Sequence, residues 1–184
     1  SIEILSASFF GFDRIFHLAA NADVRGGWSN FNIDVHNNLI ATQNVCEAAR
    51  RAGVKEIIFS STGCVYGDST QIPTLESEPF PIQTSLYGAS KVGAEGILSA
   101  YAMQGAFQAT VFRFVSVLGP NYHHGHVIDF VKKLQRNNQE LKILGDGNQR
   151  KSYIHVDDCI NALVSLRNAK NLYEFFNIEI TNLL

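Results

Sequence analysis

Tyr87 and Lys91 are the residues whose types and spacing in this sequence best suit chemistry. In a helix, a spacing of four residues places both side chains on one face, with their Cβ atoms roughly 5–6 Å apart. A phenol with a pKa of about 10 is a poor base at neutral pH, but a nearby ammonium stabilises the phenolate and lowers that pKa. The pair therefore indicates a tyrosine that acts as a general acid and base. Alone, the pattern is weak because it also arises by chance.

Polar residues also stand where three predicted strands end. Ligands of open parallel sheets bind outside the carboxyl ends of the strands, so these positions are candidate binding residues. Serine and threonine at a strand end also commonly cap a turn, and that alternative stays open for each of them. The candidates are Asn21 after residues 13–20, Ser60, Ser61 and Thr62 at the end of 55–62, and Ser116 near the end of 109–117.

The elements that must position these residues alternate between strand and helix. Apolar residues recur at three- and four-residue spacing over 35–52, and Gly53 provides a helix stop. A second helix is predicted over 85–104, and apolar strands over 13–20, 55–62 and 109–117. This order predicts an α/β fold in which a parallel sheet carries helices on both faces.

After Pro120 the pattern changes, and we expect a smaller lobe over 121–184 that folds against a sheet domain of residues 1–120. Glycine, proline and polar residues separate shorter periodic segments there. We expect a helix over 127–136, short strands over 141–144 and 152–155, and a helix to Leu166 that Asp157 or Asp158 caps.

The composition excludes several classes of protein. Apolar residues make up 46% and charged residues 17% of the chain, which indicates a buried core and not intrinsic disorder. With 15 basic and 17 acidic residues the chain has no basic footprint for nucleic acid or an anionic membrane. No apolar run approaches the ~20 residues that span a bilayer. Three cysteines without a Cys-x-x-Cys spacing are typical of a reduced, cytoplasmic protein.

A set of motifs covers nearly the whole chain in one order and resembles the extended short-chain dehydrogenase/reductase family, in its branch of nucleotide-sugar epimerases and dehydratases. The motifs lie at 16–20, 38–42, 59–67, 87–91, Arg113 with Gly119 and Pro120, and 145–158. The resemblance is to enzymes such as UDP-glucose 4-epimerase. It implies that 1–120 is the C-terminal part of a Rossmann-like NAD-binding domain and 121–184 part of a substrate-binding lobe. It also implies NAD as cofactor and a nucleotide-diphosphate sugar as substrate.

The resemblance implies a role for each matched residue. Tyr87 would take the proton of a sugar hydroxyl while the carbon of that hydroxyl passes hydride to the nicotinamide. Thr62 would hydrogen-bond the same sugar hydroxyl. Lys91 would lower the pKa of Tyr87 and bind the nicotinamide ribose. In an epimerase the transient ketone turns over and takes the hydride back on its other face. The implied cofactor contacts are Leu18, Ala19, Ala20, Asn21, Asn38, Ser60, Tyr87, Lys91 and Val115. The implied substrate contacts are Thr62, Cys64, Tyr87, Ser116, Val127, Ile128, Ile143, Leu144 and Lys151.

Departures from the family pattern narrow the activity. Dehydratases of the family carry Asp-Glu after the active-site threonine, whereas this chain has Gly63 and Cys64, which favours an epimerase. A keto-sugar reductase or dehydratase of the same family, or an inactive nucleotide-binding fragment, are the alternatives. Lys151 matches an arginine that clamps the diphosphate, and its neighbour Arg150 is an alternative partner for the phosphates.

Two further features are not expected to be catalytic. Cys64 is interpreted as a small packing residue, because nothing near it in sequence would lower the pKa of its thiol. The histidines of the polar loop have no partnering cysteine or carboxylate pattern, so no metal site is expected. These histidines are His123, His124 and His126.

The chain contains no Gly-x-x-Gly-x-x-Gly run, the turn that holds the cofactor pyrophosphate in the family. We therefore expect the chain to be the middle of a longer enzyme, truncated at both ends and inactive alone. The strand at 15–18 would then expose an unpaired apolar edge. The full-length protein is expected to be a cytoplasmic homodimer.

Overall fold

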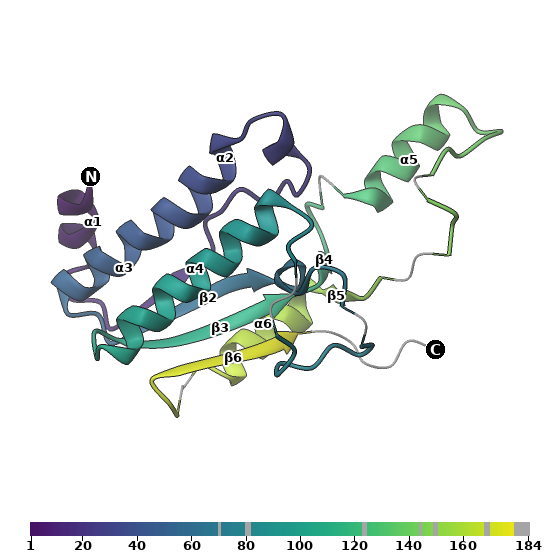
Figure 1. Ribbon diagram of the computed structural model, residues 1–184. Helices are drawn as coiled ribbons and strands as arrows, with labels where there is room; N and C mark the ends of the chain where they lie inside the picture. The colour runs from purple at the N-terminus through teal and green to yellow at the C-terminus, as the bar shows by residue number, and fades with distance from the viewer. Residues whose placement is uncertain are drawn as a thin grey trace.

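The computed structural model describes residues 1–69, 71–79, 82–122, 125–143, 145–148, 151–167 and 170–178. Its centre is a parallel four-stranded sheet in the order β1-β2-β3-β6, whose arrows point in one direction in Figure 1. The strands are β1 (Arg14–His17), β2 (Glu56–Thr62), β3 (Gln108–Phe114) and β6 (Tyr173–Ile178). The central strands β2 and β3 are buried along most of their length, as expected for strands covered on both sides.

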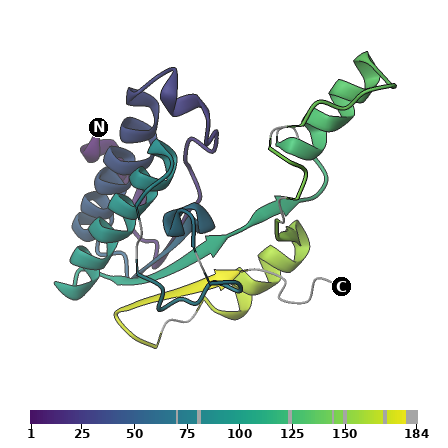
Figure 2. The same ribbon diagram turned by 45° about the vertical axis from the view of Figure 1, so that its right-hand side comes forward.

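Helices cover both faces of this sheet (Figures 1 and 2). One face carries α3 (Ala41–Ala52) and α4 (Leu86–Met103), with α1 (Ile2–Phe9) packed against α3. The opposite face carries α6 (Val156–Ser165). This arrangement confirms the predicted Rossmann-like α/β fold, although the sequence did not predict α1.

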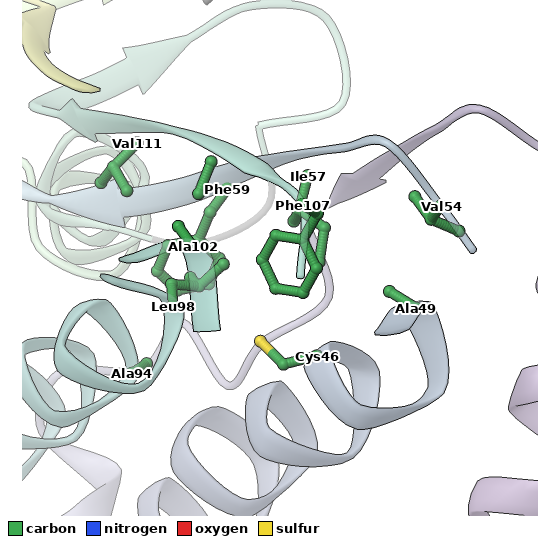
Figure 3. Packing of buried hydrophobic residues seen from close by; sticks show 11 residues of the cluster. Cys46, Ala49, Val54, Ile57, Phe59, Ala94, Leu98, Ala102, Phe107 and Val111 are labelled. Atoms are coloured by element: carbon green, nitrogen blue, oxygen red, sulfur yellow. The ribbon is translucent and has the colours of Figure 1, made fainter. Parts of the chain in front are cut away.

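Alternate residues of the strands feed two separate cores. On the α3 and α4 side, Ile57, Phe59 and Val111 pack against Cys46 and Leu98 (Figure 3). On the α6 side the other strand residues meet the helix, and this smaller core contains Ile58, Phe112, Ile154, Cys159, Leu163 and Ile178. The larger core fixes α4 on the sheet, and α4 carries both Tyr87 and Lys91.

The predicted helix over 35–52 begins differently from an ordinary α-helix. A short α2 (Asn32–Asp34) leads into the π-helix η2 (Val35–Ile40), and only then does α3 begin. The π-helix turns Asn38 inward, next to the buried Asp34. At the other end Gly53 has φ 74° and ends α3, as predicted.

The segment predicted as one strand over 109–117 is two strands in different sheets. The chain leaves the central sheet at Val115, and β4 (Ser116–Leu118) then pairs in parallel with β5 (Tyr153–His155). Helix α5 (His126–Arg136) extends away from the central sheet in both views (Figures 1 and 2). Residues 141–143 form no strand, contrary to the expectation for 141–144, whose last residue lies outside the described part.

Two other details of the C-terminal half differ from expectation. Strand β6 pairs with β3 in the central sheet, so the region 121–184 also contributes to the sheet and is not confined to a separate lobe. His155 caps α6, because its side chain accepts a hydrogen bond from the backbone N–H of Asp157 at 3.3 Å. Asp157 and Asp158 lie in the first turn, where their charge suits the helix dipole.

Replacement of Leu98 by alanine is expected to lower the free energy of unfolding by about 2–5 kcal/mol, because the side chain is completely buried between α4 and the sheet. Urea denaturation measures the change. Met103→Ala on the same helix is the control, since Met103 is 65% exposed and its loss should cost less than about 0.5 kcal/mol. Equal effects of the two variants would contradict the described packing.

Candidate functional site

The end of β2 holds the Tyr87 and Lys91 pair in place. The Lys91 ammonium donates a hydrogen bond to the Ser60 carbonyl oxygen at 2.8 Å, and the Thr62 side chain lies close enough to the Tyr87 hydroxyl to lower its pKa. Ser85 caps α4 by accepting a hydrogen bond from the backbone N–H of Gly88 at 3.0 Å. The helix therefore begins just before Tyr87, and the two side chains lie on its sheet-facing side.

A second set of hydrogen bonds fastens the loop after β1 to the same helix. The Asn38 side-chain oxygen accepts from the backbone N–H of Asn21 at 2.8 Å, and its amide donates to the Ser90 hydroxyl at 2.9 Å. The Asn21 amide donates to Asp34 at 2.7 Å. The Ser90 hydroxyl donates in turn to the carbonyl oxygen of Tyr87 at 2.7 Å. Asn38 is only 1% exposed, and its hydrogen bonds order this loop; its role as a cofactor contact stays a prediction.

The other residues of this loop are placed as a ligand-facing edge requires. Leu18, Ala19 and Ala20 follow the last residue of β1 and are exposed, and Asn21 is half-buried. Ser60, on the neighbouring strand, is also half-buried, and its hydroxyl donates weakly to the carbonyl oxygen of His17 at 3.4 Å.

A cavity of about 730 Å³ opens at the carboxyl end of the sheet. Its wall brings together six of the residues that the sequence predicts, namely Thr62, Cys64, Tyr87, Val115, Ser116 and Lys151. Val115, predicted as a cofactor contact, thus lies with the predicted substrate contacts.

Further cavity residues were not predicted as contacts. Tyr66, Arg113 and Asn177 form part of the wall, and the Tyr66 hydroxyl donates to the Asn177 side-chain oxygen at 2.9 Å. Tyr66 and Arg113 both lie in the motifs that carried the resemblance, so the sequence contained a signal for them. Asn177 comes from β6, whose pairing with β3 no local pattern indicated.

Several predicted substrate contacts lie elsewhere. Val127 and Ile128 belong to α5, and neither they nor Ile143 are among the cavity residues. Leu144 lies outside the described residues, as do Arg150, His123 and His124. An ion pair of Arg25 and Asp129 at 3.1 Å joins α5 to the loop after β1. Roles for these residues in binding a nucleotide base stay predictions.

The electrostatics of Tyr87 differ from the expectation. Burial raises the pKa of Tyr87 to about 12, the charges of Cys64 and Asp34 add to this effect, and the hydrogen bond with Thr62 opposes it. Lys91 is absent from these causes, so the predicted lowering of the Tyr87 pKa is not found. Burial lowers the pKa of Lys91 to about 8, which leaves the ammonium mostly charged at neutral pH.

In the part of the chain that the structure describes, no group of three or more His, Cys, Asp or Glu side chains could hold a metal ion. No helix among the described ranges is long and apolar enough to cross a membrane.

His17 gives the site a pH dependence that can be measured. Burial and the positive charge of Lys91 lower the pKa of His17 from 6.5 to about 4. Between these values the unfolded chain binds a proton that the folded chain does not. The free energy of unfolding should therefore fall as the pH drops from 6.5 to 4, by up to about 3 kcal/mol.

Urea denaturation at several pH values measures this slope. His17→Gln should flatten it, whereas His36→Gln, at an exposed position, should leave it unchanged. An undiminished slope in the His17 variant would contradict the assignment.

Comparison with known proteins places this geometry in a family. The model of the family described as "NAD dependent epimerase/dehydratase family" matches residues 2–178. The UDP-glucose 4-epimerase of Mycolicibacterium smegmatis is 34% identical over 155 residues, which cover 82% of this chain and 49% of the relative. The crystal structure of a UDP-galactose 4-epimerase superposes with a TM-score of 0.83 at 35% identity, over 95% of this chain and 58% of the other.

A further solved neighbour is UDP-glucuronic acid 4-epimerase from Bacillus cereus, in complex with UDP-glucuronic acid and NAD, at a TM-score of 0.84 and 30% identity. The match covers 97% of this chain and 58% of that one. The chain spans about half the length of the curated relatives it matches. Since the family model matches nearly the whole chain, the chain belongs to the NAD dependent epimerase/dehydratase family.

Proposed function

We propose that the protein epimerises a nucleotide-diphosphate sugar through a transient keto-sugar, with NAD as its cofactor. The observation that carries this proposal is the placement of Tyr87 and Thr62 in the wall of one cavity at the carboxyl end of the sheet, with Lys91 one helical turn after Tyr87 and bound to Ser60. Three of the relatives and neighbours described above are UDP-sugar 4-epimerases, and one of them was solved with a UDP-sugar and NAD.

The residues around Lys91 fit the nicotinamide end of NAD. The ammonium has three N–H donors and gives one to the Ser60 carbonyl, so further donors remain for ribose hydroxyls. The exposed residues Leu18, Ala19 and Ala20 provide a small, apolar edge along which a dinucleotide can lie. When bound, the cofactor supplies the hydride chemistry, and the protein positions the reacting groups.

The cavity wall suits a sugar joined to a diphosphate. Tyr87 and Thr62 present hydroxyl groups that can hydrogen-bond a sugar hydroxyl, and Tyr87 exchanges its proton. Lys151, in the same wall, supplies a positive charge for phosphate. The volume of about 730 Å³ lies within the range of small-molecule sites, roughly 300–1,000 Å³.

A dehydratase is disfavoured by the two residues that follow Thr62. Gly63 has no side chain to transfer a proton, and Cys64, whose backbone N–H donates to Thr62 at 3.1 Å, stands in the place of a carboxylic acid. A keto-sugar reductase is the second candidate within the family, because the same tyrosine and lysine would serve it. A nucleotide-binding protein without turnover is the candidate from another class.

The experiment that tests the proposal is an interconversion assay. The purified full-length protein is supplied with NAD and a panel of UDP-, TDP- and GDP-sugars, and the products are separated by chromatography. A new epimer without net change in the cofactor supports an epimerase. Stoichiometric formation of NADH together with a keto-sugar indicates the reductase running in reverse, and binding by calorimetry without any product indicates the non-catalytic candidate.

The Tyr87→Phe variant is expected to lower kcat by roughly 10²–10⁴-fold while NAD still binds, because the hydroxyl that transfers the proton is lost and the ring remains. Steady-state kinetics and calorimetry measure the two properties. Tyr101→Phe is the matched control, since Tyr101 lies on the same helix with its hydroxyl donating to Glu47 at 3.2 Å, on the side of α3. Undiminished turnover in the Tyr87 variant would overturn the assignment.

We further propose that the protein is cytoplasmic and acts as a homodimer. The three free cysteines, Cys46, Cys64 and Cys159, support a reducing compartment. The dimer rests on the family resemblance, and light scattering after gel filtration measures it.

A further inference from the structure

Three consecutive residues of β2 lie against one face of α4. The Ser60 carbonyl oxygen accepts a hydrogen bond from Lys91, the Ser61 hydroxyl donates one to Glu95, and Thr62 lines the cavity together with Tyr87. Glu95 follows Lys91 by four residues, so Tyr87, Lys91 and Glu95 succeed one another on one face of the helix. The contact of Ser61, which lies between Ser60 and Thr62, is therefore made with the Glu95 carboxylate, to which the proposed chemistry assigns no role.

Glu95 is also half of a buried ion pair. Its carboxylate accepts three hydrogen bonds from the Arg113 guanidinium at 2.7, 3.1 and 3.3 Å. The two residues are 2% and 4% exposed. Arg113 stands beside Ser61 in the register of β2 and β3 and also donates to the Tyr66 hydroxyl, so the pair joins the sheet, α4 and the cavity wall.

Groups from three elements, β1, β2 and α4, surround the Lys91 ammonium or affect its charge. From β2 the Phe59 ring lies 4.6 Å from the ammonium and the Ser60 carbonyl accepts its hydrogen bond. From β1, His17 is close enough for Lys91 to lower its pKa, and from α4 the Glu95 carboxylate favours the charged form of Lys91. Arg113, from β3, donates a hydrogen bond to the Glu95 carboxylate.

We propose that Glu95 is a positioning residue, which fixes the Lys91 ammonium and the end of β2 for the acid and base chemistry of Tyr87. Its carboxylate is held by Arg113 and accepts the hydrogen bond of Ser61, so it fixes the residue of β2 that follows Ser60, whose carbonyl oxygen accepts the hydrogen bond of Lys91. A buried ion pair is weak evidence for a role in stability, because apolar residues often serve that purpose as well. The expected effect of Glu95 on turnover rests on the proposed function, whereas its expected effect on the pKa of Lys91 does not.

The test is a direct titration of Lys91. Protein labelled with ¹³C at the lysine ε-carbon is followed by NMR from pH 6 to 11, and the Lys91 signal is assigned by its loss in Lys91→Met. In Glu95→Gln the pKa of Lys91 should drop from about 8 by roughly one pH unit, a tenfold change in the protonation equilibrium. Glu47→Gln is the control. It removes a carboxylate of α3 that binds Arg50 and Arg51, and it should leave the pKa of Lys91 unchanged.

A folded Glu95→Gln protein whose Lys91 titrates as in the wild type would overturn the proposal. If the unpaired Arg113 prevents folding, the double variant Glu95→Gln with Arg113→Gln takes its place, because it removes both charges of the buried ion pair. A Lys91 pKa below that of the wild type supports the proposal, and an unchanged one overturns it. If the pKa of Lys91 is lowered in the variant but the full-length protein converts no nucleotide sugar, the positioning role of Glu95 stands and the proposed function is refuted.

Discussion

The site depends on an ammonium group that is almost completely buried. A buried charge is costly unless it is paired and hydrogen-bonded, so the structure around Lys91 must supply partners that do not move. It does so because β1 ends at His17, opposite Phe59, while β2 continues for three more residues. Beyond that point Ser60 has lost its neighbour on one side, and its carbonyl oxygen accepts the hydrogen bond of Lys91. The unequal lengths of two adjacent strands thus create the position that the lysine fills.

The regular parts of this arrangement could be predicted from the sequence. The periodicity of the apolar residues gave the helix that carries Tyr87 and Lys91, and Gly53 correctly ended the preceding one. These signals are local, since they depend on which face of a single element is buried. The candidate residues Thr62, Tyr87, Ser116 and Lys151 came together in one cavity because the motifs that contain them end at the same edge of the sheet.

Features that depend on pairing between distant segments could not be predicted. Nothing in the run over 109–117 shows that the chain changes sheets at Val115, since the partner strand β5 lies almost forty residues later. The return of β6 to β3 is equally remote, and it brings Asn177 beside Arg113. Glu95 is an intermediate case, because its spacing from Lys91 was visible while the arginine that holds it comes from another strand.

The opposite effects of burial on the two central groups define how they work together. Burial raises the pKa of Tyr87 and lowers the pKa of Lys91, because it favours the neutral form of each group. A phenol in this state is ready to donate a proton, but it can take one up only after a charged neighbour has stabilised its anion. That neighbour must stay positive in the same environment that favours its neutral form. A fixed carboxylate one turn further along the helix satisfies this requirement, and Arg113 holds it in a buried ion pair.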